Sequence, residues 1–284
     1  TVKAQTAEEG HMEMKNSLKI WAIVIAVIVL VIAIVAAFLI GKGLGTEKEP
    51  ASQSEPNITK EKKDEVSDTH SGNGEKWKKS DSDVFGRSIK VPSNGAGNPL
   101  TDKVDTEKET CDTPDSQQVT IQSTHFVQTL WSETSGPSSN EDSIPGGYAR
   151  TPEGAMLAAW NSNVLFQHGG DLAKPLLEKS FTGEKAREEL KSVSGAEMPT
   201  SEGASDMPAP SAYRVTSCDD SRVIGDLAVP FPTDKNGDPD KKSWGILRVS
   251  AVWENGDWKT ELDEVEQPVE EEISNLDGWS RWEF

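Results

Sequence analysis

Residues 252–259 read Val-Trp-Glu-Asn-Gly-Asp-Trp-Lys, which is the pattern of two β-strands joined by a two-residue turn. Asn-Gly favours a type I′ turn because both central positions need a positive φ. This turn places Trp253 opposite Trp258, so we expect a cross-strand pair of indoles, buried on the face of the sheet toward the helices. Alternating apolar and polar residues predict further antiparallel strands over 213–217, 223–229 and 244–254.

A helix start stands at Thr151-Pro152-Glu153, with an N-capping threonine, a proline at the first helical position and an acidic residue in the first turn. Two shorter helices are predicted from Asp171 and from Thr182, and a strand is expected over 119–127. Helices followed by long antiparallel strands predict an α+β fold, with the helices packed on one face of a curved sheet.

An apolar run, Trp21–Ile40, holds twenty residues without a charge, a polar side chain or a proline. A helix of this length spans about 30 Å, the thickness of the hydrocarbon core of a bilayer. The run is longer than the apolar region of a signal peptide, and no small-residue cleavage site follows it. We therefore predict a permanent single-pass transmembrane helix.

Composition divides the chain into four parts. We predict a cytoplasmic tail at 1–17, a transmembrane helix at 18–40, a disordered polar linker at 41–118 and an extracytoplasmic domain at 119–284. The lysines that flank the span are balanced, so the short N-terminal tail, not charge, orients the N-terminus inward. The linker carries few large apolar residues, too few to offset the entropy of ordering a chain.

The part at 119–284 carries 29 acidic and 14 basic residues, so its net charge is −15. Such a domain repels polyanions, which argues against direct nucleic-acid binding and against docking on an anionic membrane surface. It also holds seven of the nine tryptophans, which supports a folded core. Among these aromatic residues, we expect core or interface positions for Trp160, Trp244, Trp253 and Trp258.

The stretch 146–159 reads Gly-Gly-Tyr-Ala-Arg-Thr-Pro-Glu-Gly-Ala-Met-Leu-Ala-Ala. It resembles the signature of an uncharacterised actinobacterial family of single-pass membrane proteins, in which a Cys-x-x-Pro element and a Trp-rich segment come first, as Cys111 to Pro114 and Trp131 do here. The resemblance covers about residues 111–284. It implies an NTF2-like cone and a scaffold subunit of a conjugation-type secretion channel, because relatives often sit on conjugative elements.

Cys111 and Cys218 are the two cysteines of the chain. If both are exported, they can form a disulfide, which in the chain-entropy model contributes up to about 4–5 kcal/mol. Two separate free thiols are the alternative. The histidines at 11, 70, 125 and 168 lack the spacing of zinc ligands, so we predict no metal and no cofactor.

Two further groups of residues resemble a calcium site and a catalytic site. Asp234, Asn236, Asp238 and Asp240 alternate as calcium ligands do, but the glycine stands one place off the EF-hand order, and lysines follow where a glutamate is required, so a polar loop is favoured. His168 with Asp171, or Tyr213, would be the catalytic candidates of a cone-shaped pocket. No nucleophile elbow, phosphate loop or dinucleotide fingerprint accompanies them, so we predict that the protein is not an enzyme.

These observations predict a membrane-anchored scaffold or adaptor of a cell-envelope assembly, most specifically a conjugative DNA-transfer apparatus. The partners expected are the membrane and other envelope or secretion proteins, and a homo-oligomer stays open. The alternative is an exported module that binds a ligand or a cell-wall component.

Overall fold

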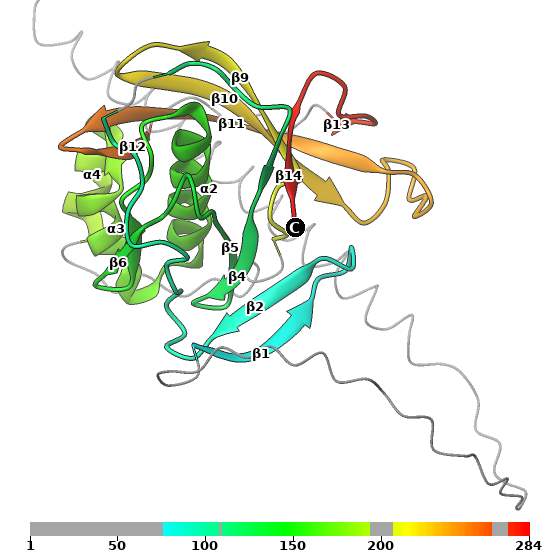
Figure 1. Cartoon of the computed structure of the whole chain (residues 1–284), viewed down its shortest axis with the longest axis horizontal. Coiled ribbons are helices and arrows are strands. Elements are labelled where there is room, and N and C mark those ends of the chain that lie inside the picture. Colours follow the sequence, from blue (N-terminus) through cyan, green and yellow to red (C-terminus); the bar gives the residue numbers. More distant parts are fainter. Residues whose placement is uncertain (1–75, 108–109, 194–206, 263–271) are drawn as a thin grey trace, which may run out of the picture. The chain divides into compact units, whose positions relative to one another are not determined.

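Long antiparallel strands form the centre of an eight-stranded sheet in the computed structural model (Figure 1). The structure describes residues 76–107, 110–193, 207–262 and 272–284. The order of the sheet is β3-β14-β9-β10-β11-β12-β8, and β13 also pairs with β11. Its strands are β3 (Ser116–Gln118), β8 (Phe181–Thr182), β9 (Ala212–Cys218), β10 (Arg222–Phe231), β11 (Ser243–Glu254), β12 (Asp257–Glu261), β13 (Glu272–Ile273) and β14 (Ser280–Glu283).

The β11–β12 hairpin has the predicted register. Trp253 pairs with Trp258, and Asn255 and Gly256 hold φ values of 58° and 84° in the turn. The two indole rings lie 5.2 Å apart at an interplanar angle of 71°, an edge-to-face arrangement. Trp258 is buried, whereas Trp253 is only partly buried, so the prediction of two fully buried indoles holds for one of them.

A second sheet of four strands has the order β1-β2-β4-β5. Its strands are β1 (Trp77–Ser82), β2 (Ser88–Pro92), β4 (Thr120–Thr124) and β5 (Val127–Trp131), and a separate hairpin holds β6 (Ser139–Glu141) and β7 (Ile144–Gly146). One residue separates β3 from β4, and this Val119 donates its N–H to the carbonyl of Glu283 at 2.8 Å. The chain thus passes directly from the large sheet into the small one.

The helices are α2 (Pro152–His168), the single 3₁₀ turn η1 (Gly170–Leu172), α3 (Ala173–Lys179) and α4 (Glu184–Val193). The predicted cap of α2 is confirmed, since the Thr151 hydroxyl accepts from the Gly154 N–H at 3.2 Å. The third helix begins two residues later than predicted, because Phe181 and Thr182 pair with β12 as β8.

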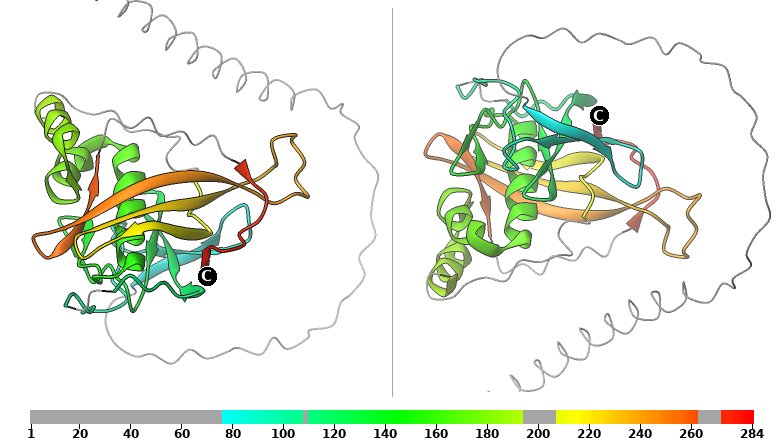
Figure 2. Two further views of the ribbon diagram at one scale, coloured as in Figure 1. Left: turned by 90° about the horizontal axis from the view of Figure 1, so that it is seen from above. Right: turned by 90° about the horizontal axis from the view of Figure 1, so that it is seen from below.

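Helix α2 lies between the two sheets and is buried on all sides (Figures 1 and 2). It contacts β10, β11 and β12 of the large sheet and β5 of the small one. Fourteen of its 17 residues are buried, from Pro152 to Leu165. Its first turn packs so closely on the preceding segment that a Cβ at Gly154 would meet the Ala149 carbonyl oxygen at 2.1 Å. A side chain at Gly154 would therefore displace the start of the helix.

Side chains of α2 take the place of a neighbouring strand along the free edge of β5. The Asn161 amide accepts from the Leu130 N–H at 2.8 Å and donates to the Leu130 carbonyl at 2.9 Å. The Trp160 indole N–H donates to the Gln128 carbonyl at 2.8 Å. A buried strand edge without partners would carry costly unsatisfied backbone groups. These bonds therefore allow the helix to bury the edge of the small sheet.

The outer face of the large sheet carries a second, smaller apolar cluster. It contains Ala212, Ala228, Ile246, Leu276 and Trp279, with Trp244 and Ile273 packed against it. The residues from β13 to β14 therefore cover part of the face opposite α2.

The predicted α+β, NTF2-like fold class is wrong, because the described residues are 41% strand and 20% helix. The excess of strand comes partly from residues 76–131, where the sequence analysis expected a linker and then one strand. The expected strand at 119–127 is instead divided between β4 and β5, with a turn at His125 and Phe126. The small sheet therefore adds a whole layer beyond the predicted helices and large sheet.

The disordered linker predicted at 41–118 is also corrected, since β1, β2 and β3 lie within it. This part of the chain has too few apolar residues for a core of its own. A few tertiary contacts hold it in position instead. The Arg87 guanidinium bonds Asp83 at 2.6 Å and the Ala209 carbonyl at 2.8 Å, and it lies 4.7 Å from the ring centre of Phe284. Composition does not reveal contacts made over such distances in sequence.

The predicted cytoplasmic tail and the predicted span at Trp21–Ile40 lie outside the described residues. Among the helices that the structure does describe, none has the length and apolar character needed to cross a bilayer.

Replacing Asn161 by alanine should lower the free energy of unfolding by about 3–5 kcal/mol. The change leaves both backbone groups of Leu130 unpaired inside the protein, and each such group costs about 1–3 kcal/mol. Urea unfolding of the full chain, followed by tryptophan fluorescence, measures the loss.

The matched control is Asn163→Ala on the same helix. Asn163 donates one bond to the Ala159 carbonyl at 2.8 Å, so we expect a loss below about 1.5 kcal/mol. Equal losses in the two variants would contradict the role given to Asn161.

Candidate functional site

The segment that leads into α2, residues 146–151, is held by the end of the β11–β12 hairpin. The Asp257 carboxylate accepts from the Gly147 N–H at 2.7 Å and from the Tyr148 N–H at 3.0 Å. The Trp258 indole N–H donates to the Ala149 carbonyl at 2.8 Å. Two consecutive residues of β12 thus fix three consecutive residues of the segment, which positions the beginning of the central helix.

A cavity of about 180 Å³ lies beside this contact, between the β6–β7 hairpin, α2 and α3. Ligand sites for drug-sized molecules typically enclose about 300–1,000 Å³, so this cavity suits a few waters or a very small polar molecule. Polar groups in its wall bond to one another. The Tyr148 hydroxyl accepts from Asn161 at 3.1 Å, and the Ser162 hydroxyl lies 2.6 Å from that of Thr260, which lies outside the wall.

Burial governs the electrostatics of this cavity. It raises the pKa of the Asp257 carboxyl above its usual range, against the lowering effect of the backbone amides of Tyr148, Gly147 and Trp258. Burial also raises the pKa of the Tyr148 hydroxyl, so this group stays neutral at physiological pH. The lining residues include no histidine and no cysteine. Asp257 and Tyr148 are thus held by hydrogen bonds to the segment before α2 and to Asn161.

The catalytic candidates His168 and Tyr213 lie near opposite ends of α2. Tyr213 is buried against Trp282, with ring centres 4.5 Å apart, and interacts electrostatically with Glu153 in the first turn of the helix. His168 is the last residue of that helix, which spans about 25 Å at 1.5 Å per residue. Asp171 follows His168 in η1, and no hydrogen bond between these two side chains is found in the described residues. The first candidate pair, His168 with Asp171, is thus not joined by a hydrogen bond in the described residues, and the alternative candidate, Tyr213, lies near the other end of α2.

The four expected aromatic positions differ in surroundings. Trp160 is fully buried and Trp258 nearly so, both in the main core. Trp244 packs against the outer cluster. Trp253 is partly buried, and the Arg150 guanidinium lies 5.2 Å from its ring centre. Trp160 and Trp258 are thus core residues, and Trp253 is the partly accessible member of the hairpin pair.

A disulfide joins Cys111 to Cys218, with a Cα–Cα distance of 5.8 Å across 107 residues of sequence. It ties the segment before β3 to the end of β9, at the edge of a cavity of about 230 Å³ that Arg150 and Trp258 also line. The bond therefore links the N-terminal part of the described fold to the large sheet.

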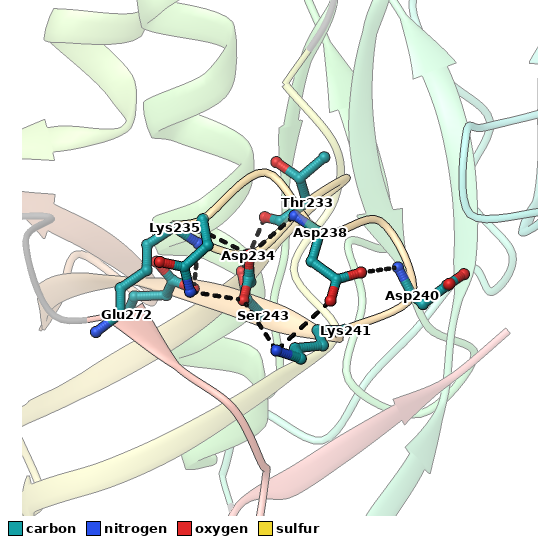
Figure 3. A network of polar contacts seen from close by, with 9 residues as sticks. Thr233, Asp234, Lys235, Asp238, Asp240, Lys241, Ser243 and Glu272 are labelled. Carbon is teal, nitrogen blue, oxygen red and sulfur yellow. Dashed lines mark hydrogen bonds and ion pairs between the residues drawn. The ribbon is translucent and has the colours of Figure 1, made fainter.

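The loop between β10 and β11 contains the residues that were weighed as calcium ligands (Figure 3). The Asp234 carboxylate accepts from the backbone N–H groups of Asn236 and Asp238 at 2.8 and 2.9 Å. The Lys241 ammonium lies 3.9 Å from the Asp234 carboxylate and 3.5 Å from that of Asp238. Lys241 thus offsets part of the negative charge of Asp234 and Asp238, and the aspartates order the loop backbone.

Sequence reasoning missed a charged cluster on the outer face of the large sheet. The Asp226 side chain is fully buried and binds Arg248 at 2.8 Å and Arg214 at 2.9 Å, from the two neighbouring strands. Arg214 also lies 4.6 Å from the ring centre of Trp279. The sequence does carry a signal for this cluster. It consists of a lone aspartate within an apolar strand and two arginines in the adjacent strands.

An open groove of about 370 Å³ lies between β8, α4 and the end of the large sheet. Its charged lining residues are Arg187, Asp219, Arg222 and Glu261. Arg222 and Glu261 form an ion pair, and Ser250 donates to Glu261 at 2.9 Å.

The chain belongs to a family described as a domain of unknown function, DUF8175, whose sequence pattern matches residues 86–281. A comparison with curated proteins finds no match. A comparison with solved structures finds no match either. The matched range covers β2, both cysteines and α2, but it begins after β1.

Replacing Asp226 by asparagine should reduce stability in a pH-dependent way. Burial alone would raise the pKa of the Asp226 carboxyl, but the hydrogen bonds from Arg248 and Arg214 outweigh it, so the pKa lies below its usual range. Ionised Asp226 therefore stabilises the fold above the unfolded pKa of about 3.9, and this contribution is lost as the pH falls through the folded pKa.

We expect Asp226→Asn to cost about 2–3 kcal/mol at pH 7, because the arginines are partly solvated. The difference from the wild type should shrink below about pH 4. Asp171→Asn, at an exposed position, is the control and should stay within about 0.5 kcal/mol of the wild type. A penalty for Asp226→Asn that stays constant from pH 7 to pH 3 would contradict the assignment; urea unfolding at each pH measures it.

Proposed function

We propose that this chain is a non-enzymatic, membrane-anchored scaffold or adaptor of a cell-envelope assembly. The observation that carries the proposal is the use of the polar groups around Tyr148, Asn161 and Asp257. They hold the helix, the hairpin and the small sheet together, and they are arranged neither to activate a nucleophile nor to bind a sizeable ligand. A rigid domain built this way suits a role as an interaction platform.

The proposed location outside the cytoplasm is supported by chemistry. A disulfide persists in oxidising compartments such as the cell exterior, and the chain contains Cys111–Cys218. The apolar run at Trp21–Ile40 supplies the anchor in this proposal. The strongly acidic composition favours partners with basic surfaces and disfavours nucleic acid.

The assembly we propose is a conjugative, type IV secretion-like apparatus for DNA transfer. This step rests on the resemblance of residues 111–284 to an actinobacterial family that often sits on conjugative elements. In this proposal the chain contributes protein contacts to the channel and does not touch the transferred DNA.

A second candidate function is binding of an exported ligand or a cell-wall component. The open groove of about 370 Å³ beside Arg187 and Arg222 favours it, because its volume falls within the range of ligand sites and its lining is charged.

Crosslinking on intact cells separates these functions. The full chain, with a C-terminal affinity tag, is treated with a membrane-impermeant amine-reactive crosslinker, and a permeant crosslinker of the same reach is the matched control. We expect the impermeant reagent to join the chain to proteins of the transfer channel, because the domain is exported in this proposal. Identification is by mass spectrometry after purification under denaturing conditions.

Crosslinks to cell-wall peptides alone would replace the scaffold function by the second candidate. Products formed only with the permeant reagent would overturn the proposed location.

A further inference from the structure

The edge strand β1 is largely exposed. Within the described residues β1 has a single neighbour, β2, and lies at the end of the four-stranded sheet (Figure 1). Five of its six residues are exposed, and Trp77 is partly buried. A strand that buries so little gains little from packing, and an edge strand presents backbone groups that can pair with another strand. A further strand along this edge would provide the missing pairing.

Backbone groups of β1 point outward at alternate residues. Asp83 donates its N–H to the Arg87 carbonyl at 3.1 Å, which makes this a hydrogen-bonded pair at the end of the hairpin. The alternation of antiparallel ladders then directs the N–H and C=O groups of Ser82 and Ser80 away from β2. The Ser82 N–H already donates to the Asp81 carboxylate at 3.0 Å, so the N–H and C=O of Ser80 are the groups that a second strand would bond first.

In one register, the charged residues of β1 would lie opposite residues of opposite charge on a second copy of β1. Lys79 and Asp81 flank Ser80 and form an ion pair with each other at 2.9 Å, and their side chains remain 63% and 56% exposed. In a symmetric antiparallel pair that meets at Ser80, each Lys79 lies opposite Asp81 of the other strand. The registers on either side would place Lys79 opposite Lys79, or Asp81 opposite Asp81. Lysine on an edge normally discourages pairing, but this register gives each lysine a second aspartate, from the other strand, in addition to Asp81 of its own strand.

We propose that β1 pairs edge to edge with β1 of a second copy of this chain, antiparallel and centred on Ser80. The two four-stranded sheets then join into one sheet of eight strands. The pairing uses a strand that lies before the range matched by the family. It stands independently of the proposed function, because it requires neither a membrane nor another partner.

Single-cysteine crosslinking in the full chain tests the register. In the proposed pair the two Ser80 Cα atoms lie about 5.5 Å apart, within the range that a disulfide bridges. The two Ser82 Cα atoms lie about 13 Å apart along the strands, which is too far. We expect Ser80→Cys to give a covalent dimer on mild oxidation, whereas Ser82→Cys, the matched control, should give at least about tenfold less. Non-reducing electrophoresis measures the yield.

Equal yields from the two variants, or no dimer from Ser80→Cys, would overturn the proposal. A charge swap in the Ser80→Cys background tests the complementarity separately. Lys79→Asp or Asp81→Lys alone should lower the dimer yield about tenfold, because like charges then face each other twice. The double variant Lys79→Asp/Asp81→Lys should restore it. A double variant as weak as the single variants would show that the charges do not set the register, and it would contradict the proposed pairing.

Discussion

The side chain of Asn161 allows one helix, α2, to pack against both sheets. Helix α2 is buried on every side, so any backbone edge that it covers must find its hydrogen bonds within the protein. The amide of Asn161 donates to the Leu130 carbonyl and accepts from the Leu130 N–H, and the Trp160 indole N–H donates to the carbonyl of Gln128. Without these bonds the edge of β5 would need either water or a further strand. The helix could then not lie against the small sheet, and the fold would lose its middle layer.

The positioning of α2 depends in turn on the segment that precedes it. Asp257 binds the backbone of Gly147 and Tyr148, and Trp258 binds that of Ala149, so the β11–β12 turn fixes where the helix begins. The close approach of Gly154 to Ala149 permits no side chain at that helical position. The disulfide adds a covalent link between the segment before β3 and the large sheet. Polar residues such as Asp257 thus hold the parts of the domain together. For this reason we favour a scaffold over an enzyme in our proposal.

Local patterns predicted the elements whose signals lie close together in sequence. The Asn255-Gly256 turn, the register of Trp253 with Trp258 and the capped start of α2 are such cases, since each depends on a few adjacent residues. The small sheet could not be predicted in this way. Its β1 and β2 carry few apolar residues, and contacts of Arg87 with residues more than a hundred positions away hold them in place. The Asp226 cluster was missed for the same reason, because its three members lie on three strands. The composition of residues 76–118 indicated a linker because composition carries no information on contacts between residues far apart in sequence.

Hydrogen exchange of the full chain tests most directly whether α2 is the centre of the fold. The account predicts that the amides of α2 exchange only through global unfolding, together with those of β10 and β11. The amide of Leu130, on an edge strand but bonded to Asn161, should be equally protected, whereas amides of β1 that face outward exchange readily when the chain is monomeric. Fast exchange at Leu130 and in the middle of α2, with the large sheet still protected, would contradict the account, because the sheet would then be the independent core and the helix an addition to it.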